Sequence, residues 1–116
     1  MTAVIPEVFI ESMAEKFQML ADPSRLRILK ALMSTEMNVG EIVKSTALSQ
    51  ANVSKHLRLL TKAHLLARRR AGLNVYYKLS DPIVERICTL VCKTILHEFK
   101  LSRQRRLPKL KSRSKS

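Results

Sequence analysis

The spacing of apolar residues changes after His64, and this change constrains the fold more than any other feature of the sequence. Before His64, apolar residues recur every three or four positions, and the segment 49–63 shows this spacing most clearly. After His64, apolar and polar residues alternate through 73–80, as they do in a half-buried strand. Segments 65–70 and 73–80 are therefore predicted to pair as a β-hairpin around Ala71-Gly72.

Start signals divide the helical part of the chain. Pro6 can open a first helix, and Asp22-Pro23 joins a capping residue to a proline that is tolerated at the first helical position. A short helix over 39–45 is followed by a break and by Ser49, a good N-cap for a helix that ends near residue 63. Asp81-Pro82 opens a last long helix with a broad apolar face. We predict a mainly α fold with a small β-hairpin, a winged helix-turn-helix, with the first and last helices buried against a second subunit.

The charge of the chain indicates a polyanionic partner. The 116 residues include 22 Lys and Arg against 9 Asp and Glu, a formal net charge of +13. Residues 1–102 are predicted to form one domain, and residues 103–116, which are rich in Lys and Arg and contain no acid, a disordered basic tail. The tail either contacts DNA without sequence preference or only keeps the protein in solution.

Composition excludes several other classes of protein. Gly40 and Gly72, the two glycines, cannot supply a glycine-rich nucleotide loop, and no Ser-His-Asp set, carboxylate pair or H-E-x-x-H motif indicates an enzyme. No run approaches the ~18 apolar residues of a membrane span, and the first residues do not resemble a secretory signal. Two cysteines cannot form a disulfide framework, so we expect a cytoplasmic protein with reduced thiols.

The helix after Ser49 carries side chains suited to reading DNA. Its first turns present uncharged side chains to base edges, and Gln and Asn are the types that pair bidentately with adenine. Its later basic side chains suit phosphates or guanine, and the arginine run of the predicted wing suits the DNA backbone. The predicted DNA-binding residues are Ser49, Gln50, Asn52, Ser54, Lys55, His56, Arg58, Arg68, Arg69 and Arg70. The role of His56 stays open, because it flanks the apolar stripe and can be either a DNA contact or a partly buried histidine. Alternation along the strand places Arg69 on the opposite face from Arg68 and Arg70.

Three segments together resemble the ArsR/SmtB family of bacterial winged-helix repressors: LADPSRLRILKAL at 20–32, LSQANVSKHLRLLTKAHLL at 48–66 and RRRAGLNVYYKLSD at 68–81. The resemblance implies a homodimer formed through the first and last helices, and a double-stranded DNA operator bound by the helix at 49–60. It also implies that an inducer relieves repression, and that Ser49, Gln50, Ser54 and His56 contact DNA. The chain departs from the family at His64, where glycine is usual.

The chain also departs from the family at its two usual metal sites. The thiolate box falls on 36–42, where Asn38 and Gly40 replace the cysteines. At the zinc site of the last helix, Asp81 and His97 are kept, but Ile83 and Thr94 replace the histidines. Zinc takes four ligands, so we predict no metal at either family site.

Cys88 and Cys92 lie four residues apart on the last helix and share a face. Two thiols at this spacing can bind one soft species such as arsenite, Cu(I) or a persulfide sulfur, or pair with thiols across a dimer. Buried cysteines also act as small apolar residues, and both cysteines alternate with Ile and Val here. Sensing and packing both stay open.

The sequence thus favours a sequence-specific transcriptional repressor of the ArsR type, released from its operator by an inducer that the thiols of Cys88 and Cys92 can sense. The alternative is a basic protein that packages nucleic acid or binds RNA mainly through its charge. Gln50 and Asn52 discriminate between the two, because charge-driven binding does not need uncharged base-reading side chains.

Overall fold

The computed structural model describes residues 4–104 and divides the chain into two compact units, Met1–Asp81 and Pro82–Ser116. The predicted single domain over 1–102 stays a prediction, and the division between the two units falls at the start of the last helix. That helix continues to Gln104, so residues 103 and 104, which were predicted to belong to the tail, are helical. The rest of the predicted tail, 105–116, lies outside the described residues.

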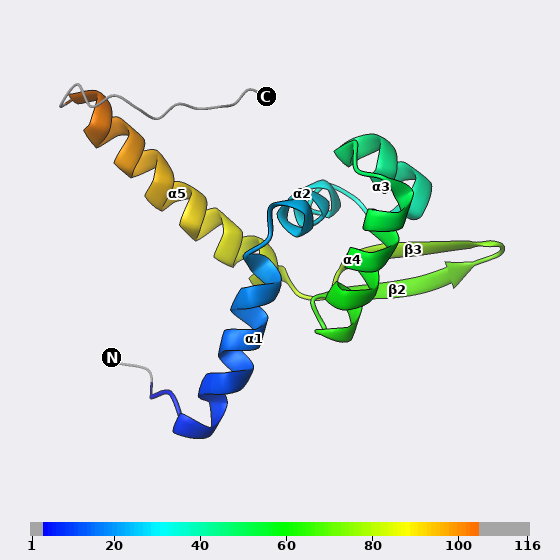
Figure 1. Ribbon diagram of the computed structural model, residues 1–116, viewed down its shortest axis with the longest axis horizontal. Coiled ribbons are helices and arrows are strands. Elements are labelled where there is room, and N and C mark those ends of the chain that lie inside the picture. Colours follow the sequence, from blue (N-terminus) through cyan, green and yellow to red (C-terminus); the bar gives the residue numbers. More distant parts are fainter. Residues whose placement is uncertain (1–3, 105–116) are drawn as a thin grey trace. The chain divides into compact units, whose positions relative to one another are not determined.

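The first unit is a winged helix-turn-helix, as predicted (Figure 1). Its described part contains a short 3₁₀ helix, four α-helices and three strands, and the β2–β3 hairpin extends beyond α4. In chain order the elements are η1 Glu7–Phe9, α1 Ile10–Leu20, α2 Pro23–Leu32, β1 Met37–Asn38, α3 Val39–Thr46, α4 Gln50–Lys62, β2 Leu66–Ala71 and β3 Asn74–Leu79.

Side-chain caps fix where the helices of this unit begin. Asp22 caps α2 by accepting a hydrogen bond from the Arg25 backbone N–H at 3.0 Å, with Pro23 at the first helical position. Asn38 and Glu41 form a reciprocal capping box at the start of α3, with both hydrogen bonds at 2.9 Å. Each cap satisfies backbone N–H groups that have no partner within the helix.

The sheet contains one strand more than the sequence predicted. β3 lies between β2 and β1, and both pairings are antiparallel. The β2–β3 register sets Leu66 opposite Leu79 and Arg68 opposite Tyr77, and β1 places Met37 opposite Tyr77 on the other side. The sequence does not predict β1, because a strand of two residues has no alternation to detect.

The core of the first unit lies where α2, α3 and α4 meet the base of the hairpin. Ile28, Leu29, Ile42, Val53 and Leu60 have no exposed surface, and Leu57 has 1% exposed. The remaining buried apolar side chains of this unit are Leu32, Leu65 and Leu66. Val53, Leu57 and Leu60 therefore form the inner face of α4, as the helical spacing of apolar residues in 49–63 predicts.

Left-handed residues bracket α4. Ala47 has φ 62° in the turn after α3, and His64 has φ 65° just beyond the end of α4. Residues other than glycine adopt this conformation at some cost, and His64 adopts it at the position where glycine is usual in the family. Gly72 takes φ 65° at the hairpin turn, where glycine has no such cost.

The described part of the second unit is the helix α5, Pro82–Gln104, and Val84 is its one buried residue. Large apolar side chains along it are exposed: Ile83, Leu90, Val91, Ile95, Leu96, Phe99 and Leu101. None of the helices within residues 4–104 has the length and apolar character that crossing a membrane requires.

Candidate nucleic-acid interface

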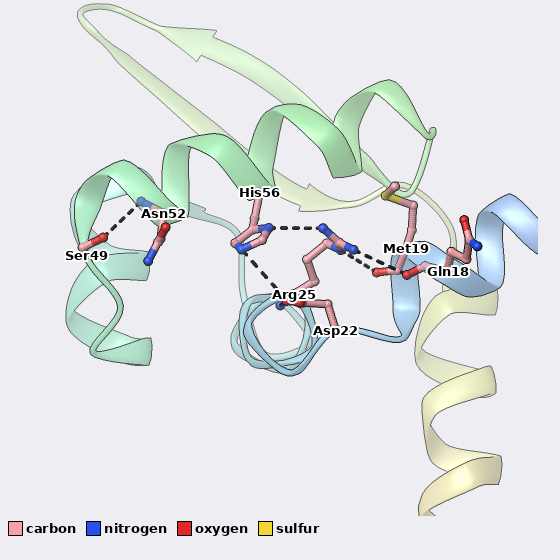
Figure 2. Close-up of polar contacts among 7 residues, drawn as sticks. All are labelled: Gln18, Met19, Asp22, Arg25, Ser49, Asn52 and His56. Atoms are coloured by element: carbon pink, nitrogen blue, oxygen red, sulfur yellow. Dashed lines mark hydrogen bonds and ion pairs between the residues drawn. The ribbon is translucent and has the colours of Figure 1, made fainter.

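The first turns of α4 present a polar, exposed surface. The Ser49 hydroxyl accepts a hydrogen bond from the Asn52 backbone N–H at 3.1 Å, which fixes the start of the helix (Figure 2). The side chains of the predicted readers Gln50, Asn52 and Ser54 are exposed, and so is Lys55. Because the opposite face of the helix is buried in the core, this outer face is the one that can enter a groove of DNA.

A basic hollow lies beside this surface, between α4 and the sheet. We use this name for a hollow of ≈ 460 Å³ lined by Val39, Ser54, Arg58, Thr61, Lys62, Arg68 and Tyr77. Three of the lining side chains are cations, none is a carboxylate, and Thr61 Oγ1 is buried without a hydrogen-bond partner among the described residues. Cations with hydroxyl donors and no nearby acid form a suitable site for a phosphate oxygen.

The arginines of the hairpin divide between its two faces. Arg68 lines the basic hollow, whereas Arg69 donates from Nε to both carboxylate oxygens of Glu36, at 3.1 and 3.2 Å. The Arg69 guanidinium also lies 5.0 Å from the centre of the Tyr76 ring. The hydrogen bond from Arg69 holds the pKa of the Glu36 carboxyl below its usual value and raises the pKa of Arg69. Of the three predicted wing contacts, Arg69 is thus already paired within the protein.

His56 does not lie with the other predicted DNA-contact residues. Its side chain is 7% exposed and faces α2, where Nδ1 lies 3.4 Å from an Arg25 nitrogen and Nε2 lies 4.0 Å from Asp22 Oδ2 (Figure 2). Burial lowers the pKa of His56 and outweighs the attraction of the Asp22 carboxylate. The reading of His56 as a buried histidine with internal partners therefore holds, and its ring is not available to a DNA base.

Comparison with known proteins identifies the family of this chain. Residues 22–67, which include α4 and its caps, match the family model described as bacterial regulatory protein, arsR family. Over 82 residues the chain is 44% identical to a transcriptional repressor SmtB homolog from Synechocystis, covering 67% of this chain and 62% of that protein. The chain is also similar to the crystal structure of NolR from Sinorhizobium fredii, with a TM-score of 0.70 and 32% sequence identity. This match covers 81% of this chain and 96% of NolR. The chain belongs to the ArsR family.

Another solved structure similar to this ArsR-family chain is a homodimeric winged helix-turn-helix DNA-binding domain from Mycobacterium bovis. That likeness has 26% identity and a TM-score of 0.71, and it covers 88% of this chain and 95% of the domain. The chain spans 62–66% of the length of three curated relatives that it matches. Family membership confirms the predicted resemblance, and the family is one of regulatory proteins and not of enzymes.

The residues of the two usual ArsR-family metal sites have other partners here. Asn38 caps α3, and the Thr94 hydroxyl donates to the Leu90 carbonyl oxygen at 3.1 Å. Within residues 4–104, no three His, Cys, Asp or Glu side chains lie close enough together to hold a metal ion. That the family sites bind no metal stays a prediction.

The two thiols of this ArsR-family chain differ in exposure. Cys88 is half-buried and burial raises the pKa of its thiol, whereas Cys92 is exposed. Both are free within the described residues. Their exposure is consistent with either sensing or packing, so the alternatives drawn from the sequence stay open.

Sequence reasoning missed residues that act through tertiary contacts. Arg25, Thr61 and Tyr77 were not predicted to belong to the site, and Glu36 was not predicted to pair with Arg69. Arg25 follows Asp22 by three residues in the family motif, which is the one local signal that pointed toward it. The other three depend on how the sheet packs against α4.

Proposed function

We propose that this protein is a cytoplasmic, homodimeric, sequence-specific repressor of transcription, which binds a double-stranded DNA operator and is released from it by an inducer. One observation carries the proposal: the exposed, uncharged start of α4 lies directly beside the basic hollow, while the reverse face of α4 is buried. Base reading and phosphate binding therefore meet on one surface of the fold.

The two parts of this surface have different tasks. The major groove is ~12 Å wide and admits one helix, so the first turns of α4 can reach base edges through Gln50, Asn52 and Ser54. The cations of the basic hollow then meet the phosphates that border the groove, with Arg58, Lys62 and Arg68 as the contacts. Lys55 and Arg70, which are exposed, add further backbone contacts.

Dimerisation is proposed from apolar surface that a single chain leaves uncovered. On α1 and the segment before it, Val8, Phe9 and Phe17 are 80%, 56% and 55% exposed, and α5 exposes a longer series. Surface of this kind marks an interface, and the related Mycobacterium bovis domain is homodimeric. A two-fold dimer would place two copies of α4 on half-sites about 34 Å apart, one turn of DNA.

The proposed inducer is a thiol-reactive species, such as arsenite, another soft ion or an oxidant, at Cys88 and Cys92. Soft ligands prefer thiolates, the two thiols share one face of α5, and the exposed Cys92 is open to attack first. Arsenite or a mild oxidant should weaken DNA binding by the wild type and leave the Cys88→Ser, Cys92→Ser double variant unaffected. An equal response of both proteins would assign the thiols to packing.

The test of the proposed function is a competition experiment. The wild type is used to select 30-bp duplexes from a randomised library, and its affinity for the enriched duplex is compared with that for random DNA at physiological salt. Specific binding should be about 10³-fold tighter or more. A ratio near one would support the alternative, a protein that packages nucleic acid through its charge.

A further inference from the structure

Arg25 joins three segments of the first unit through one guanidinium group. Its Nε donates to the Met19 carbonyl oxygen at 3.0 Å, and a terminal nitrogen lies 3.5 Å from the Gln18 carbonyl oxygen, both at the end of α1. The other terminal nitrogen lies 3.4 Å from His56 Nδ1 on α4. Figure 2 shows this guanidinium between the end of α1 and the His56 ring.

The chemistry of these partners fixes the protonation state of His56. A guanidinium can only donate hydrogen bonds, so His56 Nδ1 must accept. The ring proton then lies on Nε2, which faces Asp22 Oδ2 at 4.0 Å. This network therefore requires a neutral His56, which lies between the carboxylate of Asp22 and the guanidinium of Arg25.

Protonation of His56 would break this arrangement. Both ring nitrogens of a charged imidazole are donors, so Nδ1 could no longer accept from Arg25. The ring would also carry positive charge beside Arg25 on α2 and Lys55 on its own helix, and Asp22 is the one acid that faces it within residues 4–104. Asp22 already accepts the capping hydrogen bond of α2, so its capacity to compensate is limited.

The position of His56 connects the network to DNA reading. His56 lies on α4 between the exposed Ser54 and Arg58, whose side chains line the basic hollow. α1, at the other end of the network, carries apolar surface assigned above to the dimer. Arg25 thus holds the helix that reads DNA in a fixed relation to a helix that sets the spacing of the two subunits.

We propose that Arg25 is a positioning residue for DNA binding, which holds α4 against α1 and α2 through a neutral His56, and that protonation of His56 weakens this hold and lowers DNA affinity. The proposal rests on the proposed function. It explains why the family motif residue His56 is turned inward. Burial, which lowers the pKa of His56, agrees with the neutral state that the geometry requires.

The sign of the pH effect follows from this direction. Because the folded protein disfavours the charged ring, protons that bind as the pH falls below the ordinary histidine value of 6.5 favour states in which His56 has left the network. DNA affinity should therefore fall between pH 7.5 and 5.5.

The experiment measures dissociation constants for the library-selected duplex at pH 7.5 and 5.5. The wild type should lose about fivefold more affinity than His56→Gln, whose neutral amide can accept from Arg25 and donate toward Asp22 at both pH values. His97→Gln, which replaces a histidine of α5 outside the network, should respond as the wild type does. Equal pH ratios for the wild type and His56→Gln would overturn the proposal.

A second variant keeps the proposal testable if His56→Gln fails to fold. Arg25→Lys retains the charge but replaces the planar guanidinium with a compact ammonium, which cannot reach the carbonyl oxygens of α1 and His56 at once. At pH 7.5 it should therefore weaken binding about fivefold while the salt dependence stays that of the wild type. A lower salt slope would instead make Arg25 a direct phosphate contact and overturn the positioning role. If the wild type selects no duplex, the proposed function fails, whereas specific binding with unchanged variants defeats only the inference about Arg25.

Discussion

α4 and α5 are both amphipathic helices, but their apolar faces are covered to very different extents. α4, with 13 residues, buries Val53, Leu57 and Leu60 together with His56. α5, with 23 residues, buries Val84 alone, while Ile95 remains 57% exposed. A helix gains most of its stability from packing its apolar face, so the two helices must obtain it from different sources.

The difference separates what the chain stabilises by itself from what it offers to another molecule. The inner face of α4 is part of the core of the first unit, and its outer face is free for DNA. The exposed apolar face of α5 is suited to a second copy of the chain. Both roles can be tested with substitutions on these two helices.

The largest effect is expected in the core. Leu57→Ala removes a side chain that is 1% exposed and should lower the free energy of unfolding by about 2–5 kcal/mol, measured by urea denaturation. Lys55→Ala, on the outer face of the same helix, should stay within about 0.5 kcal/mol. Similar losses for both would contradict the assignment of the two faces of α4.

The next effect tests the face of α5. Ile95→Glu places an unpaired charge on the proposed dimer surface and should raise the dimer dissociation constant about thirtyfold, or about 2 kcal/mol, by analytical ultracentrifugation. Thr89→Glu adds the same charge at another exposed position of α5 and serves as the matched control. An unchanged dimer in Ile95→Glu would remove this face from the interface.

A third effect concerns base reading by the outer face of α4. Gln50→Ala should cost about 1–3 kcal/mol with the selected duplex and relax the preference at one base pair, because the proposed role of its amide is to pair with a base edge. Binding to random DNA should hardly change. Fluorescence anisotropy with single-base variants of the duplex measures both, and an equal loss on random DNA would contradict base reading.

The smallest effect compares neighbours on the wing. Arg68→Ala removes a cation from the basic hollow and should reduce the salt slope of DNA binding by about 0.9. Arg69→Ala removes the exposed ion pair with Glu36, should hardly change the free energy of unfolding, and should leave the salt slope unchanged. A lower salt slope for Arg69→Ala together with an unchanged slope for Arg68→Ala would show that Arg69 leaves Glu36 to bind phosphate.

Local signals were sufficient to predict most of the fold. Asp22-Pro23, Ser49 and the alternation after His64 each define an element boundary through neighbouring residues, and the structure confirms the helices and the hairpin that they predict. β1 was missed because its two residues become a strand only by pairing with β3. Such pairing leaves no periodic signal in so short a segment.

Side-chain partners were harder to predict than helices. The orientation of His56 depends on Arg25, which lies 31 residues away, and the pairing of Arg69 depends on Glu36, which lies 33 residues away. The sequence did show that Arg69 and Arg68 point to opposite faces, but it did not show which face meets α4.

The left-handed residues Ala47 and His64 lie in the turns just before and just after α4. An α-helix advances about 100° per residue around its axis, so a single inserted or deleted residue between them would turn one end of α4 by that angle relative to the other. Gln50 and Leu57 could then no longer face solvent and core together. A change in the number of residues in this interval would therefore disturb the core and the DNA-binding surface together.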